Sequence, residues 1–236
     1  MERDAPPFQD RYALGVEKGL PWILELLDKT GVKATFFVVA SLLEEYPWIG
    51  EEITRRGHEL ASHGYTHRRM DRIDRDEAKR EISKSIDVLS SFQRVESFRA
   101  PNLQPPRLSA GDLYSLGIRV DSSYAAYKKG HPKKPLWDNG ILILPATHTS
   151  SIIRMPRVLV EKTIIRSTKG VKVLFYHPWE FTRIRRKPLY RPDIWMRTGA
   201  YARSMLSYLI EEASKNHSFM LVREAPGLYE RYPSRV

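Results

Sequence analysis

Short apolar segments of strand length alternate along this chain with segments of helical periodicity. The strand-like segments are residues 33–40, 58–62, 96–99, 118–120, 141–144, 171–176 and 219–222. Helical patterns occupy residues 20–29, 42–46, 47–56, 74–92, 109–116 and 198–215, and residues 124–139 are typical of a surface loop. This alternation predicts a mostly parallel sheet covered by helices, an α/β fold whose chemistry lies at the carboxyl ends of its strands.

The length and composition favour one soluble domain over residues 1–236. No apolar run approaches the roughly 18 residues that cross a bilayer, and the opening Met-Glu-Arg-Asp does not resemble a signal peptide, so we expect a cytoplasmic protein without a transmembrane segment. The chain has no cysteine, which excludes disulfides and thiolate metal sites. Scarce Asn and Gln beside 28% charged residues favour a thermophilic source.

A net charge of +11 raises the question of an anionic partner. Much of the excess lies in residues 68–80, where acidic residues are interspersed, and in residues 183–203, where they are few. Charge runs are usually solvated surface, and we do not expect nucleic acid as a partner. The second segment would instead suit a phosphorylated or lipid-linked sugar.

The strongest chemical signal is Ser62-His63-Gly64-Tyr65-Thr66-His67, directly after a predicted strand. Two imidazoles four residues apart can meet at one ion if the segment makes a helical turn. Neutral imidazole is a common ligand of zinc and similar divalent ions, and catalytic sites typically add a carboxylate. The pattern alone is weak, because surface or packing histidines have the same spacing.

A third histidine, His177, follows the predicted strand at residues 171–176, in Phe175-Tyr-His-Pro-Trp-Glu180. An imidazole with an ordinary pKa of about 6.5 can act as a general acid or base there. A histidine that only hydrogen-bonds its neighbours is the alternative.

Other polar residues lie at strand ends or at the amino terminus. Arg99 could orient a carboxylate through paired hydrogen bonds, or form a structural salt bridge. Asp121-Ser-Ser-Tyr124 offers polar groups to a ligand, or is a turn that ends a strand. Glu2 and Asp4 would share one face of an extended segment, unless the terminus is disordered.

In their order and spacing, these motifs resemble the polysaccharide deacetylases, carbohydrate esterase family four with its nodulation-type chitooligosaccharide deacetylase domain. The resemblance runs over residues 2–181 and rests on Lys33-Ala-Thr-Phe-Phe-Val-Val-Ala40, Gly57-His-Glu-Leu-Ala-Ser-His-Gly-Tyr-Thr-His67, Phe98-Arg-Ala-Pro101, Asp121-Ser-Ser-Tyr124 and Phe175-Tyr-His-Pro-Trp-Glu180. It implies a distorted, incomplete (β/α) barrel of about seven strands.

The resemblance also implies a metal-dependent hydrolase that removes an acyl group, expected to be acetyl, from an amino sugar. A divalent ion, usually zinc, would be held by His63, His67 and an amino-terminal carboxylate, for which we choose Glu2 with Asp4 as the alternative. Asp4 would then serve as the base, held by Arg99, and His177 would protonate the departing amine. The implied pocket for the sugar or acyl group is lined by Tyr124 and Trp179.

Two alternatives remain open. The same fold could hydrolyse a non-sugar amide, such as a formamide or a ring amide. A catalytically impaired protein that binds carbohydrate or another partner is the second, and it is favoured by a departure from the family pattern at the amino terminus. In this branch of the family, the first motif resembles Asp-Val-Glu-x-Asp at the end of a first strand, whereas this chain opens Met1-Glu2-Arg3-Asp4.

We predict that the missing strand and acid are encoded upstream of Met1, with an internal GTG valine codon read as the start. Sequencing the genomic DNA should then show in-frame codons for an apolar strand that ends in Asp. The extended chain should release acetate faster than the chain that starts at Met1, which would lack its usual base. A stop codon directly upstream would refute this prediction.

Overall fold

The computed structural model describes residues 13–167, 170–185 and 192–231. The chain forms two compact units. One, here called the sheet unit, comprises Lys33–Thr147 and Met220–Val236, and the other, the helical unit, comprises Glu2–Val32 and His148–Phe219. Among the described residues, no helix combines the length and apolar character needed to span a bilayer.

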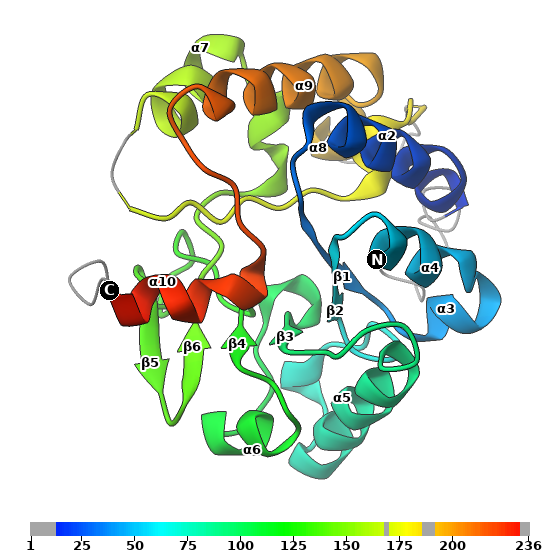
Figure 1. Ribbon diagram of the computed structural model, residues 1–236, viewed down its shortest axis with the longest axis vertical. Coiled ribbons are helices and arrows are strands. Elements are labelled where there is room, and N and C mark those ends of the chain that lie inside the picture. Colours follow the sequence, from blue (N-terminus) through cyan, green and yellow to red (C-terminus); the bar gives the residue numbers. More distant parts are fainter. Residues whose placement is uncertain (1–12, 168–169, 186–191, 232–236) are drawn as a thin grey trace. The chain divides into compact units, whose positions relative to one another are not determined.

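The sheet unit is built on a six-stranded sheet in the order β1-β2-β3-β4-β6-β5 (Figure 1). Its strands are β1 (Thr35–Val38), β2 (Glu59–Ser62), β3 (Ser97–Phe98), β4 (Val120–Asp121), β5 (Leu136–Asp138) and β6 (Ile141–Ile143). All neighbours are parallel except the β5–β6 pair. The described strands leave β1 and β5 as edges, so the sheet is not closed, which confirms an incomplete barrel.

Local sequence signals explain the helices of this unit. Its helices are α3 (Ser41–Glu45), α4 (Trp48–Arg55), α5 (Arg75–Leu89), α6 (Ala110–Ser115) and α10 (Ala225–Arg231), with short 3₁₀ turns η3 (Met70–Arg72), η4 (Pro101–Leu103) and η8 (Val222–Glu224). The carboxylate of Asp74 accepts a hydrogen bond from the amide of Glu77 and caps α5, and a reciprocal capping box of Ser109 and Asp112 begins α6. The predicted helices α3, α4, α5 and α6 are confirmed, whereas α10 was not predicted.

The register of the parallel strands determines what lies at their carboxyl ends. Val38 pairs with Ser62, Ser62 with Phe98, and Phe98 with Asp121. The next amide of each strand continues the ladder: His63 donates to Val38, Arg99 to Ser62 and Ser122 to Phe98, at 2.8–3.0 Å. Consecutive strands therefore end level with one another, and His63, Arg99 and Ser122 follow them at one edge of the sheet.

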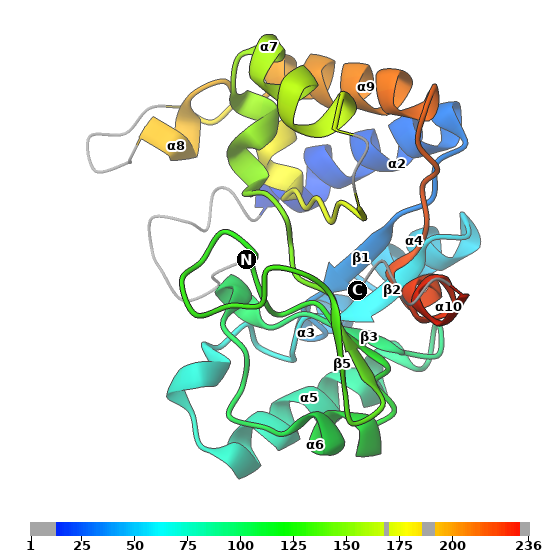
Figure 2. The same cartoon turned by 90° about the vertical axis from the view of Figure 1, so that its left-hand side faces the viewer.

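The helical unit contains the π-helical segments η2 (Gly15–Gly19) and η6 (Glu161–Ile165), the α-helices α2 (Leu20–Thr30), α7 (Arg157–Val160), α8 (Pro192–Trp195) and α9 (Ala200–Ser214), and the 3₁₀ turns η5 (Ser150–Arg154) and η7 (Pro178–Phe181). Helices α2 and α9 run beside each other (Figure 2). Gly31, in the left-handed region, ends α2 as expected.

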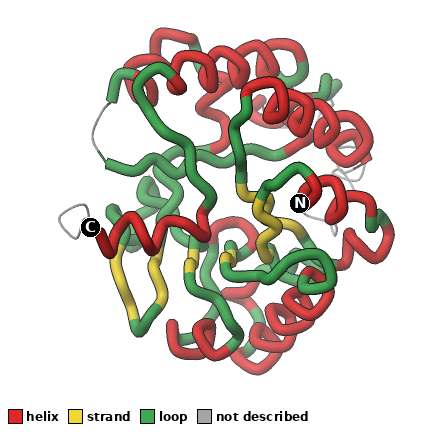
Figure 3. Tube along the Cα trace, in the orientation of Figure 1, coloured by secondary structure: helices red, strands yellow, loops and turns green. Residues whose placement is uncertain are grey.

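Two parts of the expected strand pattern are wrong. Residues 171–176 and 219–222, both expected as strands, form none, and Figure 3 shows the first of them as loop. An apolar run becomes a strand only where a neighbouring strand satisfies its backbone, and the described residues provide none there. Residues 136–138, expected in a loop, form β5, because Asn139 (φ 43°) and Gly140 (φ 81°) make the two-residue turn that suits a hairpin.

Gly19 in the helical unit permits close packing against the turn that follows His177. A Cβ atom at Gly19 would overlap the carbonyl group of Pro178, and one at Gly15 would lie 3.2 Å from the amide nitrogen of Trp179. The two glycines lie one helical turn apart, so the backbone of η2 faces η7 without intervening side chains.

We predict that Gly19→Ala lowers the free energy of unfolding by about 1–3 kcal/mol, because the added methyl group must displace Pro178. Urea denaturation measures this. Gly111→Ala is the matched control: it lies in α6 with only the Ser109 hydroxyl within 4 Å, at 3.7 Å, so alanine should stabilise by about 0.5–1 kcal/mol. Equal effects at both positions would contradict this packing.

Candidate metal centre and catalytic residues

The two predicted metal ligands lie in the loop that follows β2. His63 and His67 are separated by a turn in which Gly64 and His67 itself have positive φ, 78° and 64°, so a loop rather than the expected helical turn spans the spacing. The loop is anchored because the Gly64 carbonyl accepts a hydrogen bond from Ala40 at 3.0 Å. The imidazole centroids are 5.1 Å apart, within reach of one cation.

His63 has the tautomer that a metal ligand requires. Its Nδ1 lies 2.5 Å from the carbonyl oxygen of Arg99. A carbonyl can only accept, so Nδ1 carries the proton and Nε2 presents a lone pair. A backbone carbonyl on the second ring nitrogen is a common support for metal-binding histidines, and the residues present therefore fit a divalent ion.

The other predicted ligand and the predicted base cannot be placed. Glu2 and Asp4 both lie outside the described residues. The described residues contain no group of three His, Cys, Asp or Glu side chains suited to hold a metal ion. Of the predicted ligands, His63 and His67 lie in the described part of the chain, and their binding of a metal, like the choice between Glu2 and Asp4, stays a prediction.

Arg99 is buried beside this loop and is held in one orientation. Its side chain donates from Nε to the carbonyl of Ser122 at 3.2 Å and from Nη2 to the Ser122 hydroxyl at 2.8 Å. The guanidinium lies 4.2 Å from the ring centroid of Phe37. Burial lowers the pKa of Arg99 to about 10, so the group still carries its positive charge at neutral pH. Its expected partner, Asp4, is outside the described residues.

Asp121 is a buried acid to which the sequence analysis gave no role of its own. It ends β4, and its carboxylate accepts a hydrogen bond from the amide of Ser123 at 2.9 Å. Burial raises the pKa of Asp121 to about 6, and the charge of Arg99 opposes this only in part. An acid directly after the predicted strand at residues 118–120 was the sequence signal for it.

Tyr124, a predicted substrate-binding residue, follows three positions later. Its ring meets that of His131 edge-on, with centroids 5.5 Å apart. Burial raises the pKa of Tyr124 to about 12, so its hydroxyl is a neutral hydrogen-bond donor at physiological pH. A role in substrate binding stays a prediction.

The predicted general acid, His177, belongs to the helical unit and begins η7. Its side chain is 38% exposed. The ring of Trp179, the other predicted substrate-binding residue, stacks on His177 at 5.7 Å with a 20° interplanar angle. His177 contacts Glu180, and Glu180 in turn pairs with Arg154, which lies 26 positions earlier in the chain. The sequence assigned no role to Glu180 or to Arg154.

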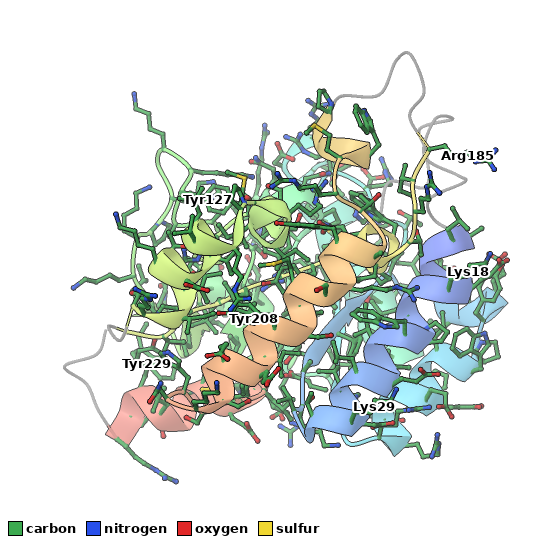
Figure 4. The ribbon with its side chains drawn as sticks, turned by 90° about the horizontal axis from the view of Figure 1, so that it is seen from above. Lys18, Lys29, Tyr127, Arg185, Tyr208 and Tyr229 are labelled. Atoms are coloured by element: carbon green, nitrogen blue, oxygen red, sulfur yellow. The ribbon has the colours of Figure 1, made fainter. Side chains whose placement is uncertain are left out.

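Among the described basic residues of the segment 183–203, some are exposed and others are packed against neighbouring side chains. Arg203 donates to the carbonyl of Phe181 at 2.7 Å and lies over the ring of Trp22. A hollow of about 360 Å³ is lined by Lys18, Arg183 and Arg203 together with uncharged residues. Lys18 and Arg185, labelled in Figure 4, are both exposed. None of the described residues that line the hollow is acidic.

Asp121 makes stability depend on pH in a defined direction. Its raised pKa means that the native state binds a proton more tightly than the unfolded chain, so stability falls as the pH rises from about 4 to about 6. We expect Asp121→Asn to gain about 2 kcal/mol relative to the unsubstituted chain between pH 4 and pH 7.

Urea denaturation with a chelator present at each pH measures this gain. Asp112→Asn is the control, because hydrogen bonds from Arg75 and Ser109 lower the pKa of Asp112 and move its titration below this range. A difference between Asp121→Asn and the unsubstituted chain that does not change with pH would contradict the prediction.

Known proteins resemble this chain in sequence and in fold. Residues 8–120 match the family model described as polysaccharide deacetylase. Among curated proteins, the peptidoglycan-N-acetylglucosamine deacetylase of Bacillus cereus is 31% identical over 86 residues. That match covers 36% of this chain and 30% of the relative, so the chain corresponds to less than a third of that protein.

Solved structures share the fold. A probable polysaccharide deacetylase from Pseudomonas aeruginosa PAO1 superposes with a TM-score of 0.69 at 17% identity, over 97% of this chain and 78% of that one. Puue allantoinase gives 0.68 at 15% identity, with the same coverage of both chains. The sequence match over residues 8–120, just under half of the chain, and the shared fold make this chain similar to the polysaccharide deacetylases.

Proposed function

We propose that this protein is a zinc-dependent hydrolase that removes an N-acetyl group from an amino sugar within a saccharide. The observation that carries the proposal is the His63 imidazole, whose Nδ1 is held by the Arg99 carbonyl at 2.5 Å while the His67 ring lies 5.1 Å away. In this tautomer, Nε2 of His63 is the nitrogen whose lone pair would bind a cation. The match of residues 8–120 to the polysaccharide deacetylase model supports hydrolysis of an amide bond on a saccharide.

Three groups of this chain would bind the ion: His63, His67 and a carboxylate from Glu2, with Asp4 as the alternative. The ion would polarise the acyl carbonyl and lower the pKa of a coordinated water toward about 7. Arg99, charged and held by Ser122, would orient the carboxylate base Asp4. The base would take a proton from the attacking water.

On the leaving side, the amine needs a proton as the C–N bond breaks, because an amide anion is a very poor leaving group. His177 would supply it. Trp179, stacked on His177, and Tyr124, with its neutral hydroxyl, would contact the sugar or the acyl group. The cationic hollow formed by Lys18, Arg183 and Arg203 would suit a phosphorylated or lipid-linked substrate.

We expect His63→Ala and His67→Ala to lose bound zinc, because each removes one ligand. Their zinc affinity should fall at least as far as the roughly 10- to 100-fold typical of losing a metal-supporting partner. Release of acetate from N-acetylglucosamine oligomers should fall with it. Elemental analysis measures the bound zinc and an acetate assay measures the hydrolysis. Both are applied to the chain that starts at Met1 and to an upstream-extended chain.

The matched control is His131→Ala, which removes an imidazole of the same unit that accepts a hydrogen bond from the Ala125 amide at 3.0 Å. It should keep its zinc. Acetate release that persists in His67→Ala would count against this site. Absence of zinc from the purified unsubstituted protein, after growth with zinc, would count against the whole proposal.

A further inference from the structure

The turn that begins at His177 contains a fully buried carboxylate with no role in the mechanism above. Glu180 is 0% exposed, and one of its oxygens, Oε1, lies 3.0 Å from both the backbone nitrogen and the ring Nδ1 of His177. A carboxylate that is ionised can only accept hydrogen bonds. The Nδ1 of His177 must therefore carry a proton, and Nε2 is the ring nitrogen left for chemistry.

The second oxygen of Glu180 faces a buried cation. Its Oε2 lies 3.0 Å from Nε of Arg154, whose side chain is 7% exposed. Burial by itself would raise the pKa of Glu180, but the hydrogen bond from His177 and the charges of His177 and Arg154 hold the pKa of this carboxyl below its usual value. Tyr176 is a further titratable neighbour of Glu180. Burial and the charge of Glu180 raise the pKa of Tyr176, so its hydroxyl stays neutral.

The imidazole plane is fixed as well as its tautomer. The ring of Trp179 stacks on His177 at 5.7 Å, and the ring of Phe175 meets it edge-on at 5.8 Å. The guanidinium of Arg154 lies over the ring of Trp179, 5.7 Å from its centroid. The contacts of Nδ1 and of both neighbouring rings together leave the imidazole one orientation.

We propose that Glu180, held by Arg154, is a positioning residue that fixes the tautomer and orientation of His177 so that Nε2 delivers the proton to the departing amine. This rests on the proposed function. In the step, the carbonyl of the acyl group re-forms and the C–N bond breaks with its electron pair on nitrogen. The nitrogen takes the proton from Nε2, and the neutral imidazole keeps Nδ1–H bonded to Glu180.

An ion pair present only for stability would not need this geometry. A buried pair of charges is often no more stabilising than apolar side chains of the same size. Here the carboxylate accepts twice from the residue that carries the proposed proton donor, and the arginine lies on its other oxygen. Acceptor, donor and counter-charge form one chain of contacts that ends at Nε2 of His177.

The test uses Glu180→Gln, which keeps the shape and the acceptor for the His177 amide but removes the charge. Two acetyl compounds separate proton delivery from the rest of catalysis: an N-acetylglucosamine oligomer, whose amine leaves only when protonated, and para-nitrophenyl acetate, whose phenolate leaves without a proton. We expect kcat for the oligomer to fall roughly 10- to 100-fold with little change in KM, while hydrolysis of the aryl ester changes by less than about threefold.

Glu161→Gln is the matched control in the same unit, because Glu161 pairs with Arg157 and Tyr208 instead of a histidine. It should leave both rates unchanged. Equal losses on oligomer and ester in Glu180→Gln would show a merely structural role and overturn the proposal, as would unchanged rates on both.

A spectroscopic measurement keeps the test independent of activity and of the proposed function. Nitrogen-15 shifts of the His177 ring should show one tautomer, with the proton on Nδ1, when the imidazole is neutral, and a mixture in Glu180→Gln. Arg154→Met retains the carboxylate of Glu180, so its kcat for the oligomer should also fall, but less than in Glu180→Gln.

If the unsubstituted protein hydrolyses neither compound, the proposed function fails, and the ring shifts still decide whether Glu180 sets the tautomer. Should Glu180→Gln fail to fold, Arg154→Met carries the test, and identical ring shifts with and without Arg154 would overturn the role of the arginine.

Discussion

The backbone ladder between β1, β2, β3 and β4 is the constraint on which the candidate metal centre depends. Because neighbouring parallel strands end level, the residue after each strand donates its amide to the last carbonyl of the strand before it. His63 and Arg99 become neighbours in this way although 36 positions separate them. The same ladder that holds the sheet together presents the Arg99 carbonyl to the His63 ring, so the tautomer of the candidate ligand follows from the register.

The two units each contain a buried carboxyl group, and their pKa values are shifted in opposite directions. In the sheet unit, burial raises the pKa of the Asp121 carboxyl, and it outweighs the hydrogen bonds of the Ser123 hydroxyl and amide and the charge of Arg99. In the helical unit, Glu180 has two hydrogen bonds from His177 and the charge of Arg154, and these outweigh burial. The first carboxyl can take up a proton near neutral pH, whereas the second stays an anion. A permanent anion suits a group that must hold a histidine.

The similarity to known proteins and the chemistry of the site support different statements. Identities of 15–17% to solved structures show the fold alone, and that fold occurs in a probable polysaccharide deacetylase and in an allantoinase. The reaction must be argued from the site itself. The described residues provide the imidazoles of His63 and His67 and the buried Arg99 in the sheet unit. The helical unit provides His177 with its carboxylate partner Glu180.

The sequence by itself determined the elements with strong local signals. Gly31 marks the end of α2, Asp74 marks the start of α5, and Ser109 with Asp112 marks the start of α6. Each of these signals acts within four residues, so it can be read from the sequence. The α/β class and the placement of His63 and Arg99 at strand ends also followed from periodicity.

Only the tertiary structure decided the rest, because those interactions join residues far apart in the chain. Residues 171–176 are mostly apolar, yet no described strand pairs with them. The Arg99 carbonyl on His63 and the Arg154 guanidinium on Glu180 come from segments 36 and 26 positions away, and no local pattern specifies which carbonyl or which arginine will meet a given side chain. Local spacing thus predicted which residues could do chemistry, while the fold selected the partners that set their protonation.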